Sequence, residues 1–265
     1  GILSPERSNS NIRSYSEEEL KKLITISILN RNGLKISRIA CLSDSELLRE
    51  VMQYSSGDES TILEFKPGEL LMSALRFGEE QFREALQPFI AEHGIENAYI
   101  RVFYPLMQKA RTLWLTDCLS RPQEQFIRYV IKSMIIAEDM VLNMSVTREA
   151  AAIINLGSSD AENNLIFLKY ILRSRGFDVV YTEGTLASEE IKGIHSIKPF
   201  TIMAINIPSS EPDVEVKGFC NKITRELKLK KVLVLGRYEN SSSWVEGKTE
   251  VASSPSALIA WADKL

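Results

Sequence analysis

The spacing of apolar residues along the chain changes near residue 150. Before that point, apolar residues recur three or four positions apart over long stretches, which is typical of amphipathic helices. After it, short apolar runs that end in glycine or polar residues alternate with helical stretches. The pattern therefore predicts a helical part followed by an α/β part, without an internal repeat of fixed period.

The first part of the chain predicts short helices and then a linker. Ser16–Glu19 is a helix start with a serine cap and carboxylates in the first turn. Ile36–Cys41 predicts a second short helix, and Ser43–Glu46 is a capping box that opens a third. Residues 55–68 are polar and rich in serine, so we expect a linker there.

Residues 69–146 predict a four-helix bundle. Each expected helix carries an apolar stripe, and the connections are short, so consecutive helices should pack side by side. The expected helices cover 69–77, 78–93, 95–115 and 122–142.

Residues 147–265 predict a flavodoxin-like (Rossmann-type) domain with a parallel sheet covered by helices on both faces. The expected strands are 151–156, 178–181, 200–207, 231–235 and a weak one at 250–252. The expected helices are 160–175, 188–194, 214–227 and 256–265. The fold class is thus multidomain, α followed by α/β.

Composition favours an ordinary globular protein. Apolar residues make up 44% and charged residues 25%, and no apolar run reaches the roughly 20 residues that span a bilayer. Cys41, Cys118 and Cys220 are widely separated and odd in number, which argues against a disulfide framework or a cysteine zinc site. We therefore expect a cytoplasmic protein with no membrane segment.

The net charge of −3 is unevenly distributed. Residues 1–38 hold seven Lys and Arg against four Glu, a surplus of three positive charges, so the remainder carries −6. A basic segment on an acidic body suits a DNA-binding element joined to a sensor, although a solvated helix of mixed charge would give the same count.

The segment Gly1-Ile-Leu-Ser-Pro-Glu-Arg7, followed by Arg13-Ser-Tyr15 and an acidic helix start, resembles the wing of a MerR-family transcription regulator. The resemblance implies a partial winged DNA-binding domain over residues 1–54 and contacts to double-stranded DNA from Arg7, Asn11, Arg13 and Tyr15. The helix that reads bases in such regulators has no counterpart in the sequence. We therefore expect weak DNA binding with little sequence preference.

A wing, a helical bundle and a flavodoxin-like domain together resemble the cobalamin-binding branch of these regulators, the light-responsive CarH/LitR type. That family places a Trp-x9-Glu-His arrangement in the bundle, above the cobalamin. Here Trp114 and Glu124 keep the spacing, and Gln125 replaces the histidine. The same residues also suit an ordinary bundle, with Trp114 in the core and Glu124 in a first helical turn.

The cobalt-binding features of that family are altered in the sheet domain. The family carries Asp/Glu-x-His-x-x-Gly after the first strand, whereas residues 157–164 hold no histidine and place Ala161 near the ligand position. A Gly-Gly after the fourth strand becomes Gly236-Arg237. We therefore predict that the fold is kept, that no metal is held and that cobalamin is lost. Cobalamin binding without a protein ligand stays an alternative.

The remaining candidate residues predict a ligand cleft and not an active site. The turn Gly157–Asp160 could hold an anion on helix N–H groups, but it lacks the lysine and glycine spacing of a P-loop. His93 and His195 carry no catalytic motif, so we expect no enzyme. The predicted cleft residues are Trp114, Glu124, Gln125, Ser158, Ser159, Asp160 and Gly236.

These observations predict a DNA-binding transcription regulator with a C-terminal sensory and oligomerisation module, acting as a homodimer or tetramer. Its ligand would be an unknown small molecule or a protein partner. Two alternatives remain: a cobalamin-dependent light-sensing repressor, and an interaction module regulated by a protein partner.

Overall fold

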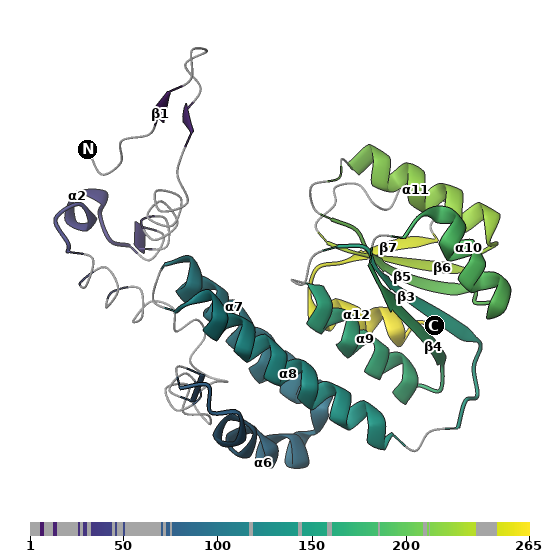
Figure 1. Ribbon diagram of the computed structural model, residues 1–265, viewed down its shortest axis with the longest axis horizontal. Coiled ribbons are helices and arrows are strands. Elements are labelled where there is room, and N and C mark those ends of the chain that lie inside the picture. The colour runs from purple at the N-terminus through teal and green to yellow at the C-terminus, as the bar shows by residue number, and fades with distance from the viewer. Residues whose placement is uncertain are drawn as a thin grey trace. The chain divides into compact units, whose positions relative to one another are not determined.

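The computed structural model contains two compact units, Gly1–Val130 and Ile131–Leu265, which we describe separately (Figure 1). The structure describes residues 6–7, 13–14, 26, 29–30, 33–43, 46, 50, 70, 73–74, 76–116, 119–142, 145–157, 161–184, 186–208, 211, 213–236 and 248–265. No helix in these ranges is both long and apolar enough to cross a bilayer.

The first unit opens with the expected β-hairpin. Strand β1 (Glu6–Arg7) pairs antiparallel with β2 (Arg13–Ser14), and the register sets Arg7 directly opposite Arg13. Farther on, helix α2 (Ile36–Ile39) packs in a small core of Leu29, Leu34 and Ile39. The capping box is confirmed, because the Ser43 amide donates to the Glu46 carboxylate (2.8 Å) and the Glu46 amide donates to the Ser43 hydroxyl (3.4 Å).

The bundle contains α6 (Glu79–Ala98), α7 (Tyr104–Leu115) and α8 (Arg121–Val141). The expected break after His93 is present as a kink within α6, where Gly94 has φ 77° and ψ 163°. Glycine adopts this left-handed backbone without a Cβ clash. The kink therefore lets two helices expected from the sequence follow each other without a loop.

A π-helical segment, η1 (Tyr99–Phe103), joins α6 to α7 and was not expected from the sequence. Pro105 lies in the first turn of α7. A proline has no N–H to donate and its ring clashes with the carbonyl four residues earlier, so a wider turn before it relieves both problems. The segment also buries Tyr99 and Phe103. Their rings lie edge to face, with 6.4 Å between the ring centroids.

The second unit is a five-stranded parallel sheet with helices on both faces (Figure 1). The strands are β3 (Ala150–Asn155), β4 (Asp178–Glu183), β5 (Ile202–Asn206), β6 (Lys231–Leu235) and β7 (Thr249–Ala252), in the order β4-β3-β5-β6-β7. The helices are α9 (Glu162–Ser174), α10 (Ser188–Ile197), α11 (Asp213–Glu226) and α12 (Pro255–Ala262). The flavodoxin-like order predicted from the alternation is thus confirmed.

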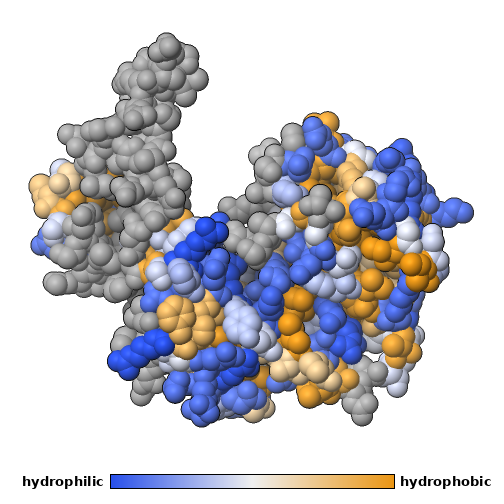
Figure 2. All heavy atoms as spheres, viewed as in Figure 1, coloured by the Kyte–Doolittle hydropathy of each residue, from blue (hydrophilic) through white to orange (hydrophobic). Residues whose placement is uncertain are grey.

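Each face of the sheet has its own pair of helices. Ile191 of α10 and Val216, Cys220 and Ile223 of α11 pack on one face in a core that includes Ile154 and Ile205 of the strands. On the other face α9 contacts β3, β4 and α12. Hydrophilic and hydrophobic residues are interspersed over the visible surface of this unit (Figure 2), as on an ordinary water-exposed protein surface.

The last turns of α8 belong to the second unit and are held to α9 by ion pairs. Lys132 Nζ lies 2.7 Å from Glu162 Oε1. Near the other end, the Asp139 carboxylate lies 2.9 Å from Lys169 Nζ and 2.6 Å from Arg173 Nη1. The compact units therefore divide inside α8, after Val130, whereas the sequence pattern placed the boundary at residue 147.

Candidate functional site

The order of the strands in the sheet reverses direction between β3 and β5. The carboxyl ends of these two strands lie next to each other at one edge of the sheet. Strand β3 pairs with β4 on one side and with β5 on the other, so the segments that follow β3 and β5 leave toward opposite faces. Open α/β sheets bind ligands at this kind of crevice. The last residues of β3 and β5 are therefore the first place to look for a site.

Two asparagines end these strands and join across the switch point. Asn155 and Asn206 are register partners, and both are buried. The Asn206 side-chain nitrogen donates to Asn155 Oδ1 over 2.8 Å, and the Gly157 amide donates to the same oxygen over 3.3 Å. The backbone amide of Gly184, after β4, donates to the Asn155 carbonyl over 3.0 Å. Asn155 thus ties together three segments at this edge.

The backbone at Gly157 passes close to the Asn206 side chain. A Cβ built on Gly157 would lie 2.3 Å from Asn206 Nδ2, which is closer than any real carbon contact. The absence of a side chain at Gly157 is therefore a condition for the asparagine pair.

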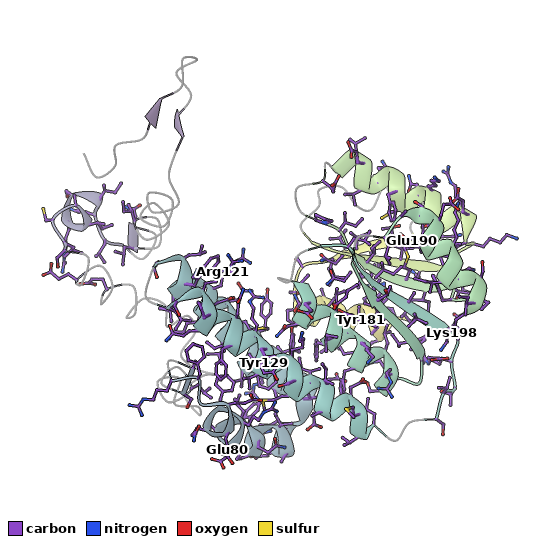
Figure 3. The ribbon with its side chains drawn as sticks, viewed as in Figure 1. Glu80, Arg121, Tyr129, Tyr181, Glu190 and Lys198 are labelled. Carbon is purple, nitrogen blue, oxygen red and sulfur yellow. The ribbon has the colours of Figure 1, made fainter. Side chains whose placement is uncertain are left out.

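A tyrosine and two carboxylates flank the pair. The Tyr181 hydroxyl of β4 (labelled in Figure 3) donates to Glu183 Oε2 over 3.1 Å. Burial, and then the charge of Glu183, raise the pKa of Tyr181, while a hydrogen bond with the Asn155 side chain lowers it. Glu162, at the start of α9, adds a further negative charge near Tyr181 and is itself paired with Lys132. The phenol is thus held in its neutral form and fixed in place.

These groups can bind and orient a ligand through hydrogen bonds. Amides and a neutral phenol offer hydrogen bonds and no nucleophile of lowered pKa. Within the described ranges, no cluster of His, Cys, Asp and Glu could hold a metal ion. His93 lies in the bundle against Phe89, and His195 lies in the last turn of α10, packed against Phe200. Because α10 runs back from the carboxyl edge, His195 is at the far end of the sheet.

Four of the cleft residues predicted from the sequence, Ser158, Ser159, Asp160 and Gly236, follow strands at this same edge. Ser158, Ser159 and Asp160 lie outside the described residues. Gly236 follows β6 with φ 144°, and its amide donates to the Ala252 carbonyl over 3.1 Å. Asn155 and Asn206 were missed, although a polar residue at the end of an otherwise apolar strand is a signal that could have found them.

The bundle residues predicted for the cleft lie in three different environments. Trp114 of α7 is half-buried, and the Arg121 guanidinium lies 5.9 Å from the centre of its ring. Glu124 is buried and paired with Arg128 one turn later on α8. Gln125 is exposed. The Glu124 carboxylate is therefore already neutralised inside the bundle.

Of the predicted DNA-binding residues, Arg7 and Arg13 stand in the β-hairpin as opposite register partners. Asn11 and Tyr15 lie outside the residues that the structure describes.

Comparison with solved structures gives three matches that we report, of which one has a TM-score above 0.5. The monomethylamine corrinoid protein from Methanosarcina barkeri matches with a TM-score of 0.56 at 13% identity, over 74% of this chain and 95% of that one. The methanol:cobalamin methyltransferase complex MtaBC from Methanosarcina barkeri has a TM-score of 0.37 at 13% identity, covering 96% of this chain and 93% of that chain. A novel cobalamin-binding protein from Desulfitobacterium hafniense DCB-2 has a TM-score of 0.37 at 11% identity, covering 76% and 98%.

The first of these matches decides the fold. Over the matched 74% of the chain, the fold is similar to that of the monomethylamine corrinoid protein. At 13% identity this likeness concerns the backbone arrangement alone, a helical bundle followed by a Rossmann-like parallel sheet. No protein-family model matches the sequence, and no curated protein sequence matches it significantly.

Proposed function

We propose that the chain is a DNA-binding transcription regulator whose cobalamin-type module senses a ligand or partner and no longer depends on cobalamin. The observation that carries the DNA-binding half is the β-hairpin, with Arg7 opposite Arg13 in its register. Like charges at opposite positions destabilise a two-stranded ladder. Contact with phosphate groups offsets that cost, and the basic surplus of residues 1–38 extends the favourable potential.

The corrinoid fold raises the question of whether the residues present suit cobalamin. Residues 157–164 contain no histidine, and Ala161 precedes the first turn of α9 without a side-chain cap. At the switch point the two paired asparagines offer amide groups, which are poor ligands for a transition metal, and the nearby Glu162 carboxylate is already paired with Lys132. The paired asparagines therefore supply no cobalt ligand.

Binding of duplex DNA by the 265-residue chain tests the first half of the proposal. Fluorescence anisotropy with a labelled 30-base-pair duplex of arbitrary sequence should show weak binding that falls steeply with salt, because neutralised phosphates release counterions. Arg7→Gln combined with Arg13→Gln should weaken it, and a control variant of a cation in the second unit, Lys228→Gln, should not. Binding that is absent at low salt, or equal in both variants, would overturn the DNA-binding role.

Cobalamin retention tests the second half. After incubation with adenosylcobalamin in the dark and desalting, the protein should be colourless. Retained visible absorbance would overturn the loss of cobalamin and restore the light-sensing alternative. A variant that places histidine in the loop, Ala161→His, measured in parallel, shows whether the cleft accepts the cofactor once a ligand is supplied.

Self-association is the proposed link between module and DNA, since two half-sites need two DNA-binding units. Removal of residues 1–54 should leave the oligomeric state unchanged in sedimentation velocity. If the shortened chain becomes monomeric while the full chain is a dimer or tetramer, the oligomerisation role of the module is wrong.

A further inference from the structure

The second unit contains a cavity at the amino edge of the sheet, away from the switch point. Its volume is about 320 Å³, and it lies beside the edge strand β4, the end of α9 and the segment that leads from α8 to β3. The size is at the lower end of the range for small-molecule sites. Its lining includes Leu142, Val146, Lys169, Arg173, Phe177 and Val179.

Backbone hydrogen bonds fix one wall of this cavity, where the segment before β3 meets the turn at Gly176. The amides of Thr147 and Arg148 both donate to the Gly176 carbonyl over 3.1 Å, which fastens the connecting segment to the turn between α9 and β4. Gly176 has φ 86°, and a Cβ there would lie 2.5 Å from the Thr147 hydroxyl oxygen. The connecting segment can approach this closely only because residue 176 is a glycine, so the cavity is formed before any ligand arrives.

Positive charge exceeds negative charge around the cavity. Lys169 and Arg173 share one carboxylate, that of Asp139, whose side chain is only 5% exposed. Arg173 Nη1 also donates to the Asp139 carbonyl over 3.0 Å. Lys169 and Arg173 have no other acceptor among the described residues, which leaves further N–H groups of both side chains available.

The second carboxylate at the cavity is neutralised by its own partner. Asp178 Oδ2 lies 2.5 Å from Lys198 Nζ. The Arg148 guanidinium lies 5.0 Å from the centre of the Phe177 ring, and the described residues give it no carboxylate. Among the charged residues that line the cavity, Lys169 and Arg173 are cations and Asp178 is the carboxylate, a surplus of one positive charge.

The cavity also has apolar side chains in its lining. Leu142, Val146, Phe177 and Val179 contribute to it, and Val146 is 64% exposed although its side chain is hydrophobic. Cationic groups and apolar side chains that line one cavity suit an anion with an apolar body.

We propose that this cavity binds a small organic anion with an apolar body, of the class of aromatic carboxylates. The anionic group would accept hydrogen bonds from Lys169 and Arg173, and the body would contact Phe177 and Val179. This proposal does not depend on the DNA-binding role, because every residue it uses lies in the second unit.

Nuclear magnetic resonance titration of the full chain with 2-naphthoate tests the proposal, and 2-naphthamide is the matched neutral probe. Naphthoate should shift the amide signals of Lys169, Arg173 and Val179 in a saturable way, and naphthamide should bind about tenfold more weakly or not at all. Shifts confined to other residues, or equal binding of both probes, would overturn the site.

Variants separate the anion site from a structural role of the same cations. Arg173→Gln should weaken naphthoate binding by about tenfold or more, whereas Lys230→Gln, which removes an exposed lysine paired with Glu149, should leave it unchanged. Val146→Trp enlarges a lining side chain that is 64% exposed, so it should abolish binding in a folded protein. Unchanged affinity in Val146→Trp would overturn the proposal even if Arg173→Gln failed to fold.

Discussion

Asn206 donates a 2.8 Å side-chain hydrogen bond to Asn155, so the ends of β5 and β3 are joined at the point where the sheet reverses its order. Both side chains are buried, and Asn155 Oδ1 accepts a second bond from the Gly157 amide. One oxygen therefore serves two donors, and its loss affects two segments at once.

The first prediction concerns this oxygen. Asn155→Ala leaves the Asn206 nitrogen and the Gly157 amide without their acceptor, and each buried unsatisfied donor costs about 1–3 kcal/mol. Urea denaturation should show a loss of at least about 2 kcal/mol in the free energy of unfolding. Asn97→Ala, which removes an exposed asparagine in α6, should change stability by about 0.5 kcal/mol or less. Similar losses in both variants would contradict the importance of the pair.

Two glycines should respond to alanine in opposite directions. Gly157→Ala forces a Cβ against Asn206, and overpacking of this kind costs about 1–3 kcal/mol. Gly193 lies within α10 with open space around its Cβ position, so Gly193→Ala should stabilise by about 0.5–1 kcal/mol. Thermal unfolding of the two variants measures both signs, and stabilisation by Gly157→Ala would show that the close approach is not needed.

The buried pair of Glu124 and Arg128 in α8 should matter far more than an exposed pair of the same spacing. Arg128→Met leaves the Glu124 carboxylate buried without its partner, which costs about 3–5 kcal/mol. Arg83→Met breaks the partly exposed pair with Glu79 and should cost about 0.5 kcal/mol or less. Chemical denaturation compares the two, and equal losses would mean that Glu124 is reached by water.

High pH should weaken the second unit through Tyr181. Its folded pKa is raised by burial and by Glu183, so the folded state keeps the proton that the unfolded state releases above the ordinary tyrosine pKa of about 10. The stability that depends on the neutral phenol is complete below about pH 10 and is lost as the pH rises further. Glu183→Gln removes one cause of the shift, so the pKa of Tyr181 in the folded protein, followed by the ultraviolet absorbance of the phenolate, should move down toward the ordinary value. An unchanged titration of Tyr181 in the variant would show that Glu183 does not act on it.

Much of the second unit could be predicted from local patterns. Its strands are continuous apolar runs because both faces of the sheet are covered, and the turn glycines mark their ends. Alternation of strands and helices then restricts the connections and the strand order. In the bundle, Gly94 marked the break that the structure shows as a kink.

The contact between Asn155 and Asn206 could not be predicted from local patterns, even though each residue stands out at the end of its strand. Asn155 and Asn206 are 51 positions apart, and their contact depends on the register between two strands that are not consecutive. The attachment of α8 to α9 has the same origin, because Asp139 meets Lys169 and Arg173 across 30 and 34 positions. Local spacing carries no information about such partners.

The continuity of α8 affects where this chain could be recombined with another protein. A crossover at residue 147, between the bundle and the sheet in sequence, would bring a foreign helix beside α9. The new helix would have to present carboxylates opposite Lys169 and Arg173 and a cation opposite Glu162. A crossover before Ile131 carries these charges along with the sheet. A segment that is exchanged intact between proteins would therefore begin inside α8, at Ile131. We expect substitutions in α9 and in the last turns of α8 to occur together.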